Sequence, residues 1–464
     1  MEKNLTSGSV FQNILQFSLP YLLSYFLQTL YGMADLFIIG KFNGVAHITA
    51  VSIGSQVMHM ITVMLVGLAM GATVTIGKAV GAKKKEAASA AVGNTVTLFL
   101  VVSAALTVLL LLFVKPIANL MSTPAEAVSG TISYLTICFA GIPFITAYNI
   151  ISSIFRGMGD SKSPMYFIAV ACAANILLDY LFIGVCSLGA AGAALGTVFA
   201  QVFSVLCALS VIFRQKTGLY VKAEHLRPRR EFLKEILKIG VPVALQDTLI
   251  QVAFIVITII ANRRGLHDAA AVGIVEKIIG VVFLVPSTML STVSALCAQN
   301  IGAKKYDRTV VILRYGVFLT VGFGLAVSVF IQLASVQVVG IFTSDERAIV
   351  LGSQYLKGYI WDCIFAGVHF CFSGYFYAYG MSGISFLHNI LSIVLVRIPG
   401  AFFASKYFAD TLFPMGLAAP AGSLLSVLIC LIAFFIMRAN KKTEFPANRL
   451  RQNAKMKLDK VHKM

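Results

Sequence analysis

Twelve stretches of the sequence are long and apolar enough to cross a lipid bilayer as helices. A helix of about 20 apolar residues spans the hydrocarbon core and satisfies all of its own backbone hydrogen bonds there. Only 12% of the residues are charged, against about 25% in soluble domains. The sequence therefore predicts an all-α membrane protein with twelve transmembrane helices, and it excludes a soluble enzyme. The twelve spans lie near residues 14–39, 47–77, 88–114, 128–155, 163–186, 188–213, 233–262, 269–296, 309–332, 349–378, 384–408 and 412–438.

The basic residues between these spans predict the orientation of the chain. With the N-terminus in the cytoplasm, the cytoplasmic segments carry 26 Lys and Arg residues, and the outer loops carry six. Such a bias is typical of cytoplasmic loops. We therefore expect a multi-pass protein of the cell membrane with both termini in the cytoplasm. Topology and attraction to anionic lipid also account for the net charge of +18, so nucleic-acid binding is not expected.

Three short motifs of the first half recur in the second half. Ile14–Pro20, Val80–Lys84 and Gly157–Gly159 resemble segments that lie 222, 221 and 223 residues further on. Six spans per repeat give both halves the same orientation, so the sequence predicts two six-helix bundles related by an internal repeat. The expected divisions are a first bundle at 1–213, a cytoplasmic linker at 214–232, a second bundle at 233–438 and a basic cytoplasmic tail at 439–464.

Polar side chains in the first half lie at matching depths in the predicted spans. Asp35 and Asp179 each lie about five residues from the outer end of a span. Asn175 is one turn before Asp179, Gln28 is two turns before Asp35, and Thr197 lies at a compatible level in the sixth span. A carboxylate inside a bilayer is costly and usually functional.

These oxygens predict a site for a coupling cation. Carboxylate, amide and hydroxyl oxygens suit a hard cation such as Na⁺. Two carboxylates close together in a low dielectric also resist joint ionisation, so the same cluster could bind protons instead. Asn149 and Ser152 of the fourth span could add oxygens or simply pack between helices. The eight cysteines and seven histidines show no metal-ligand spacing, and we expect no cofactor other than the coupling ion.

Several of these features together resemble the multidrug and toxic compound extrusion (MATE) family over residues 10–440. They are Pro20 followed by Asp35 and Gly40, the Gly-Ala-Lys-Lys loops after the second and eighth spans, the segment 156–162 and the segment 175–179. The resemblance implies a V-shaped pair of bundles that exports organic, often cationic, compounds in exchange for Na⁺ or H⁺. It also implies that Asp35, Asn175, Asp179 and Thr197 form the cation site, and that the first helix bends at Pro20.

The second half keeps the proline but not the aspartates. The positions equivalent to Asp35 and Asp179 fall near Ile257 and Phe402, so we expect ion coupling in the first half alone. The remaining polar side chains could contact substrate or support the site. They are Asp247 and Gln251 on the seventh span and Glu276 on the eighth, where Glu276 could instead pair with its neighbour Lys277. Arg397 in the eleventh span could pair internally or attract an anionic substrate.

Two other functions remain open at this point. A flippase for lipid-linked oligosaccharides would need an anion-binding cavity, for which Lys277, Lys357 and Arg397 are candidates. An intramembrane aspartyl protease would use the GxGD motif that ends at Asp160, but Asp160 and Asp179 lie on opposite sides of the predicted membrane. The sequence therefore favours a transporter, not an enzyme, that acts as a monomer on small organic molecules by alternating access.

Overall fold

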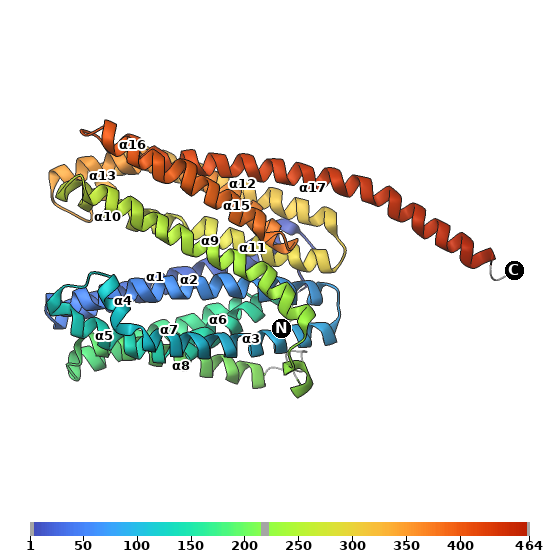
Figure 1. Ribbon diagram of the computed structural model, residues 1–464, viewed down its shortest axis with the longest axis horizontal. Helices are drawn as coiled ribbons and strands as arrows, with labels where there is room; N and C mark the ends of the chain where they lie inside the picture. Colours follow the sequence, from blue (N-terminus) through green and yellow to red (C-terminus); the bar gives the residue numbers. More distant parts are fainter. Residues whose placement is uncertain (1–3, 215–221, 462–464) are drawn as a thin grey trace.

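The computed structural model describes residues 4–214 and 222–461, with side chains up to residue 439. The described part is helical and contains no strand. Residues 1–3 and 462–464, and 215–221 of the predicted linker, lie outside the described residues. Two groups of helices lie one above the other in Figure 1, the first coloured blue to green and the second green to red. The division agrees with the internal repeat predicted from the sequence.

The first bundle contains eight α-helices and one π-helical segment. The segments are α1 (Val10–Phe42), α2 (Val45–Gly81), α3 (Lys85–Leu112), α4 (Val114–Leu120), α5 (Ala125–Ala140), α6 (Ile142–Gly157), α7 (Lys162–Asp179), η1 (Tyr180–Val185) and α8 (Gly189–Arg214). Pro20 lies inside α1, which continues unbroken across it.

The second bundle follows a short 3₁₀ helix, η2 (Ala223–Leu226), in the linker. Its segments are α9 (Arg230–Asn262), α10 (Leu266–Val282), α11 (Leu284–Gly302), α12 (Tyr306–Gly340), α13 (Glu346–Tyr359), α14 (Asp362–Ala378), α15 (Ser382–Ser392), the π-helix η3 (Ile393–Arg397), α16 (Ile398–Tyr407) and α17 (Phe413–Val461). The last helix extends beyond the bundle at the right of Figure 1.

These helices confirm the predicted spans. Ten helical segments of the described chain are long and apolar enough to cross a membrane, and α5 with α6 makes an eleventh, bent by 50°. The break between α5 and α6 at Gly141 has a counterpart between α13 and α14 at residues 360–361, about one repeat later. The pair α13–α14 covers the remaining predicted span, 349–378.

The two bundles touch at one end of the molecule. We call this the linker end, because η2 and the starts of α1 and α9 lie there, and we call the opposite end the distal end. One apolar cluster at the linker end combines Phe17 and Val74 of the first bundle with Ile239 and Leu296 of the second. At the distal end, the large clusters stay within a single bundle. The bundles are therefore joined at the linker end and separate at the distal end.

Glycines allow this close approach. A Cβ atom at any of four glycines would collide with a backbone carbonyl of the other bundle. An ion pair of 2.8 Å between Lys78 and Glu235 and a hydrogen bond from Gln299 to the Gly157 carbonyl (3.1 Å) also cross the contact. The four glycines are Gly71 and Gly81 of α2, Gly240 of α9 and Gly302 of α11.

We expect the Gly71→Ala variant to open the linker end. Its new methyl group would overlap the Ile236 carbonyl, and overpacking of this kind costs about 1–3 kcal/mol. Ala298 lies against Gly77 in this contact. A cysteine placed at Ala298 should therefore react about 10-fold faster in Gly71→Ala than with Gly71 present, when a membrane-impermeant maleimide is added on the side of the membrane that the linker end faces. Gly322→Ala is the matched control, because nothing lies within 4 Å of a Cβ there. Equal reactivity in both variants would contradict the tight contact.

The linker is fixed to the first bundle through His225. Its side chain is 1% exposed, and its Nε2 lies 2.7 Å from Glu86. The Lys222 amide donates to its Nδ1 (3.0 Å), and Asn94 of α3 donates to its carbonyl (3.2 Å). His225, Glu86 and Glu224 are close enough to hold a metal ion, but both ring nitrogens of His225 already have partners. The cluster therefore anchors the linker to the first bundle.

Candidate ion-binding site

The two predicted carboxylates come together inside the first bundle. Asp35 lies near the distal end of α1 and is 3% exposed, and Asp179 ends α7 and is fully buried. Asp179 directly precedes η1. Single π-helical turns are rare and often occur at functional sites, because the extra residue redirects side chains.

Three predicted side chains lie around the Asp35 carboxylate, and one of them makes a hydrogen bond to it. Thr197 of α8 donates a hydrogen bond of 3.3 Å to Asp35 Oδ2. Asp179 and Asn175 of α7 are the other two. Helices α1, α7 and α8 therefore converge on one point, as the matching depths indicated.

Most oxygens of this cluster have no hydrogen-bond donor from the protein. Asp35 Oδ1, both carboxylate oxygens of Asp179 and both polar atoms of the Asn175 amide, one acceptor and one donor, are buried without a partner. Buried polar atoms are nearly always satisfied, and unsatisfied ones are costly. A concentration of buried acceptors with two carboxylates fits a small cation or a proton better than a neutral packing contact.

Gly196 makes room for Asp179. A Cβ atom at Gly196 would overlap the Asp179 carboxylate. We expect Gly196→Ala to displace Asp179 from Asp35 and to weaken ion binding at least 10-fold, since a misplaced ligand loses about 1.4 kcal/mol or more. Binding of ²²Na⁺ and of protons by purified protein measures the effect. Gly32→Ala on α1 is the control, because its Cβ would meet open space. Unchanged affinity in Gly196→Ala would remove Asp179 from the site.

The other polar residues predicted in the first bundle lie outside this inner group. Gln28 is half-buried two turns from Asp35 along α1, and it does not act directly on the Asp35 carboxylate. Asn149 donates to the Ile145 carbonyl of its own helix α6 (2.8 Å). Ser152, also on α6, is buried, and its hydroxyl has no hydrogen-bond partner.

Asp247 lies where the bundles meet. A Cβ at Gly67 of α2 would lie 3.1 Å from Asp247 Oδ2. The neighbouring Gln246 accepts a hydrogen bond from Tyr377 (3.3 Å) and donates a long one to Asp247 (3.5 Å). Asp247 is half-buried, as is Gln251 one turn further along α9. Both positions are compatible with the predicted contact with substrate.

Glu276 does not form the ion pair with Lys277 that the sequence left open as one alternative. Glu276 instead accepts a hydrogen bond from Thr258 of α9 (3.1 Å), and Lys277 is exposed. Consecutive residues of a helix do not face each other, so the two side chains diverge. Glu276 thus links α10 to α9.

Arg397 has an internal partner that the sequence did not reveal. Its Nη2 lies 3.1 Å from Asp362 Oδ2 and 2.6 Å from the Ser423 hydroxyl. Asp362 is fully buried at the start of α14. A useful signal was present, because each was an isolated charge in an apolar span, and buried charges occur mostly in pairs.

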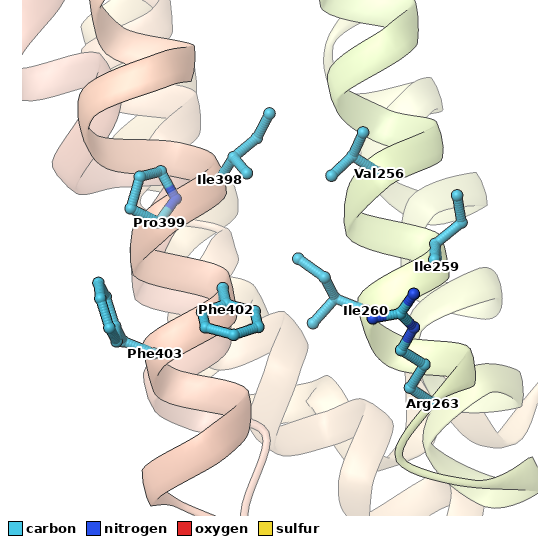
Figure 2. A pocket seen from close by; sticks show the side chains of 8 residues that line it. All are labelled: Val256, Ile259, Ile260, Arg263, Ile398, Pro399, Phe402 and Phe403. Atoms are coloured by element: carbon cyan, nitrogen blue, oxygen red, sulfur yellow. The ribbon is translucent and has the colours of Figure 1, made fainter.

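Helix α9, which corresponds to α1, and helix α16, which corresponds to the junction of α7 with η1, enclose an apolar groove. Figure 2 shows side chains of α9 and of α16 turned toward one another across it. The groove has a volume of about 440 Å³, and Arg263 contributes its single charged side chain. Apolar side chains cannot coordinate an ion, which agrees with the prediction that the coupling cluster was not duplicated. The lining residues are Val256, Ile259, Ile260, Arg263, Ile398, Pro399, Phe402 and Phe403.

The GxGD motif is a helix-capping turn. Asp160 accepts hydrogen bonds from the amides of Lys162 (2.9 Å) and Ser163 (3.1 Å) at the start of α7. Asp179 ends the same helix, 19 residues later, so the two carboxylates lie at opposite ends of it. They cannot share a catalytic water, which removes the protease alternative.

Known proteins resemble this chain in sequence and in fold. The MatE family model matches residues 20–181 and 242–403. The probable multidrug resistance protein YoeA of Bacillus subtilis is 28% identical over 91% of this chain and 92% of its own length. The multidrug export protein MepA of Staphylococcus aureus is 26% identical over 87% and 89%. A crystal structure of MATE in the bent conformation has a TM-score of 0.89 at 23% identity, over 95% of this chain and 98% of the other. An outward-facing MATE transporter has a TM-score of 0.88 at 23% identity, over 95% and 99%.

Proposed function

This chain belongs to the MatE family, whose members are multi-pass membrane transporters and not enzymes, and we propose that it exports small organic molecules in exchange for Na⁺ or H⁺. The observation that carries the proposal is the pair of buried carboxylates, Asp35 and Asp179, in which three of the four oxygens lack a protein donor. The names of relatives such as YoeA and MepA support multidrug efflux. Organic cations are the expected substrates.

We assign the coupling ion to Asp35, Asn175, Asp179 and Thr197. If the ion is Na⁺, their oxygens are its ligands in the protein; if it is H⁺, the two carboxylates share the proton. Either ion changes the charge of the cluster and the forces between α1, α7 and α8. Pro20 has no backbone N–H, so α1 is weakened there and can bend. Coupling requires that the ion bind the two conformations of the protein with different affinities.

The linker end is proposed to face the cytoplasm. The excess of Lys and Arg in the segments at this end supports that orientation. The closed linker end and the separate distal ends of the bundles then correspond to an outward-facing conformation. In this proposal the substrate leaves outward as the ion binds, and the bundles rock about their contact. We place the transporter in the cell membrane, where it acts as a monomer.

The proposal is tested by substrate efflux from reconstituted vesicles. An ethidium-like cation is followed with an imposed Na⁺ gradient or an imposed pH gradient, each alone. We expect one gradient to drive export and the other to be ineffective, which identifies the coupling ion. Export that neither gradient drives would contradict ion-coupled antiport.

A flippase for lipid-linked oligosaccharides is the alternative. It would need a positive cavity, but the Arg397 guanidinium is already neutralised by Asp362. Lys277 and Lys357 alone make a weak case for an anionic pyrophosphate. Transport of a lipid-linked pyrophosphate, with no export of the organic cation, would favour the flippase.

A further inference from the structure

The internal repeat aligns Arg397 with a residue of the ion site. The two segments that match the family model, 20–181 and 242–403, are displaced by 222 residues at both ends. That displacement sets Arg397 opposite Asn175. Asp35 corresponds in the same way to Ile257. The second bundle therefore carries a fixed positive charge at a position where the first bundle carries an ion ligand.

The surroundings of this charge are those of a cation site. The Arg397 Nη2 contacts both oxygens of Asp362 (3.1 and 3.4 Å) and the Ser423 hydroxyl (2.6 Å). Asp362 and Ser423 are fully buried. A carboxylate and a hydroxyl also surround the first-bundle site, where they come from Asp35 and Thr197, at other positions of the repeat than Asp362 and Ser423. The guanidinium thus occupies the place that a free cation would take between such ligands.

Two backbone features make space for the arginine. Arg397 ends the π-helix η3, as Asp179 directly precedes the π-helix η1. A Cβ atom at Gly422 of α17 would lie 2.5 Å from the Arg397 Cγ, so only glycine leaves a channel for the side chain. Gly196 makes the same kind of room for Asp179. Each bundle thus holds one buried charge against a glycine of its last helix.

We propose that the Arg397 guanidinium is a tethered cation that fills the second-bundle counterpart of the ion site, and that its removal opens a site for a free monovalent cation between Asp362 and Ser423. The inference rests on the proposed function, because it explains why one bundle alone takes up the coupling ion. The other titratable side chains near Arg397 are Tyr355, Tyr359 and His369. Asp362 is the carboxylate in direct contact with it.

The test is the Arg397→Ala variant in an Asp35→Asn background, where the first-bundle site is disabled. We expect its melting temperature to rise when millimolar guanidinium or Na⁺ is added. Once the site is filled, the stabilisation should grow with the logarithm of the concentration of the added cation. Equilibrium binding of ²²Na⁺ should show an additional ion per chain relative to Asp35→Asn alone. Adding Asp362→Asn should abolish both responses, and Arg397→Lys, which keeps a tethered charge, should show neither.

The outcomes separate this inference from the proposed function. The inference is overturned if the melting temperature of Arg397→Ala changes with neither guanidinium nor Na⁺, or if it changes with pH alone. Asp362 would then be a structural carboxylate. If the variant folds only when purified with guanidinium, that requirement supports the inference. If it fails to fold in either buffer while the Asp362→Leu/Arg397→Met double variant folds, the inference is wrong. Ion-driven efflux by the wild type is measured separately and decides the proposed function.

Discussion

The Asp35→Asn variant should lose ion-driven efflux while keeping its fold. Asparagine has nearly the shape of aspartate, so α1 can pack as before, but the site loses one of its two negative charges. A neutral amide binds neither Na⁺ nor a transferable proton as a carboxylate does. We expect efflux driven by the effective gradient to fall to the level of protein-free vesicles, a loss of at least about 100-fold for a coupling residue, equivalent to about 2.7 kcal/mol.

Two controls make this result specific. Asp307→Asn removes an exposed carboxylate at the start of α12 and should leave efflux unchanged. Binding of the substrate to detergent-solubilised Asp35→Asn should persist, because the substrate does not need the ion site to enter the cavity. Efflux at the wild-type rate in Asp35→Asn would reject the assignment of the coupling site.

The Asp362→Asn variant should show the largest loss of stability. It leaves the Arg397 guanidinium buried without its carboxylate, and breaking one partner of a buried ion pair costs about 3–5 kcal/mol. Asp362 is fully buried and the Arg397 side chain is 14% exposed, so solvent can do little to compensate. The free energy of unfolding in mixed detergent micelles measures this loss.

Removing both charges should restore most of the stability. Well-packed apolar residues can replace a buried ion pair at little cost, so we expect Asp362→Leu/Arg397→Met to unfold much nearer to the wild type than Asp362→Asn does. Asp410→Asn, at an exposed position between α16 and α17, is the matched single-charge control. An Asp362→Asn protein as stable as the control would show that the ion pair contributes little to the fold.

The sequence was sufficient to predict the spans, and it singled out the polar side chains that we assign to the ion site. Apolar length predicts a span, and counting residues from its end gives the depth of Asp35 and Asp179. The repeat added the relation between the bundles. These properties are local or periodic, so they need no knowledge of which helices touch.

The features that the sequence did not reveal depend on contacts between helices. Asp362 lies at the break between α13 and α14, where depth cannot be counted along a continuous helix. Its pairing with Arg397 depends on how α14 and η3 both pack against α17. The role of Gly71 likewise depends on the Ile236 carbonyl, a contact between bundles for which α2 alone has no signal.

The most direct test of the central claim is ion movement driven by substrate alone. Vesicles containing the transporter receive a gradient of an organic cation and no gradient of Na⁺ or H⁺. By reciprocity of coupling, wild-type protein should move the coupling ion in the direction opposite to the substrate, and Asp35→Asn and Asp179→Asn should move none. If either variant moved the ion in the direction opposite to the substrate, with the same number of ions per substrate molecule as the wild type, a coupling site formed by Asp35 and Asp179 would be contradicted.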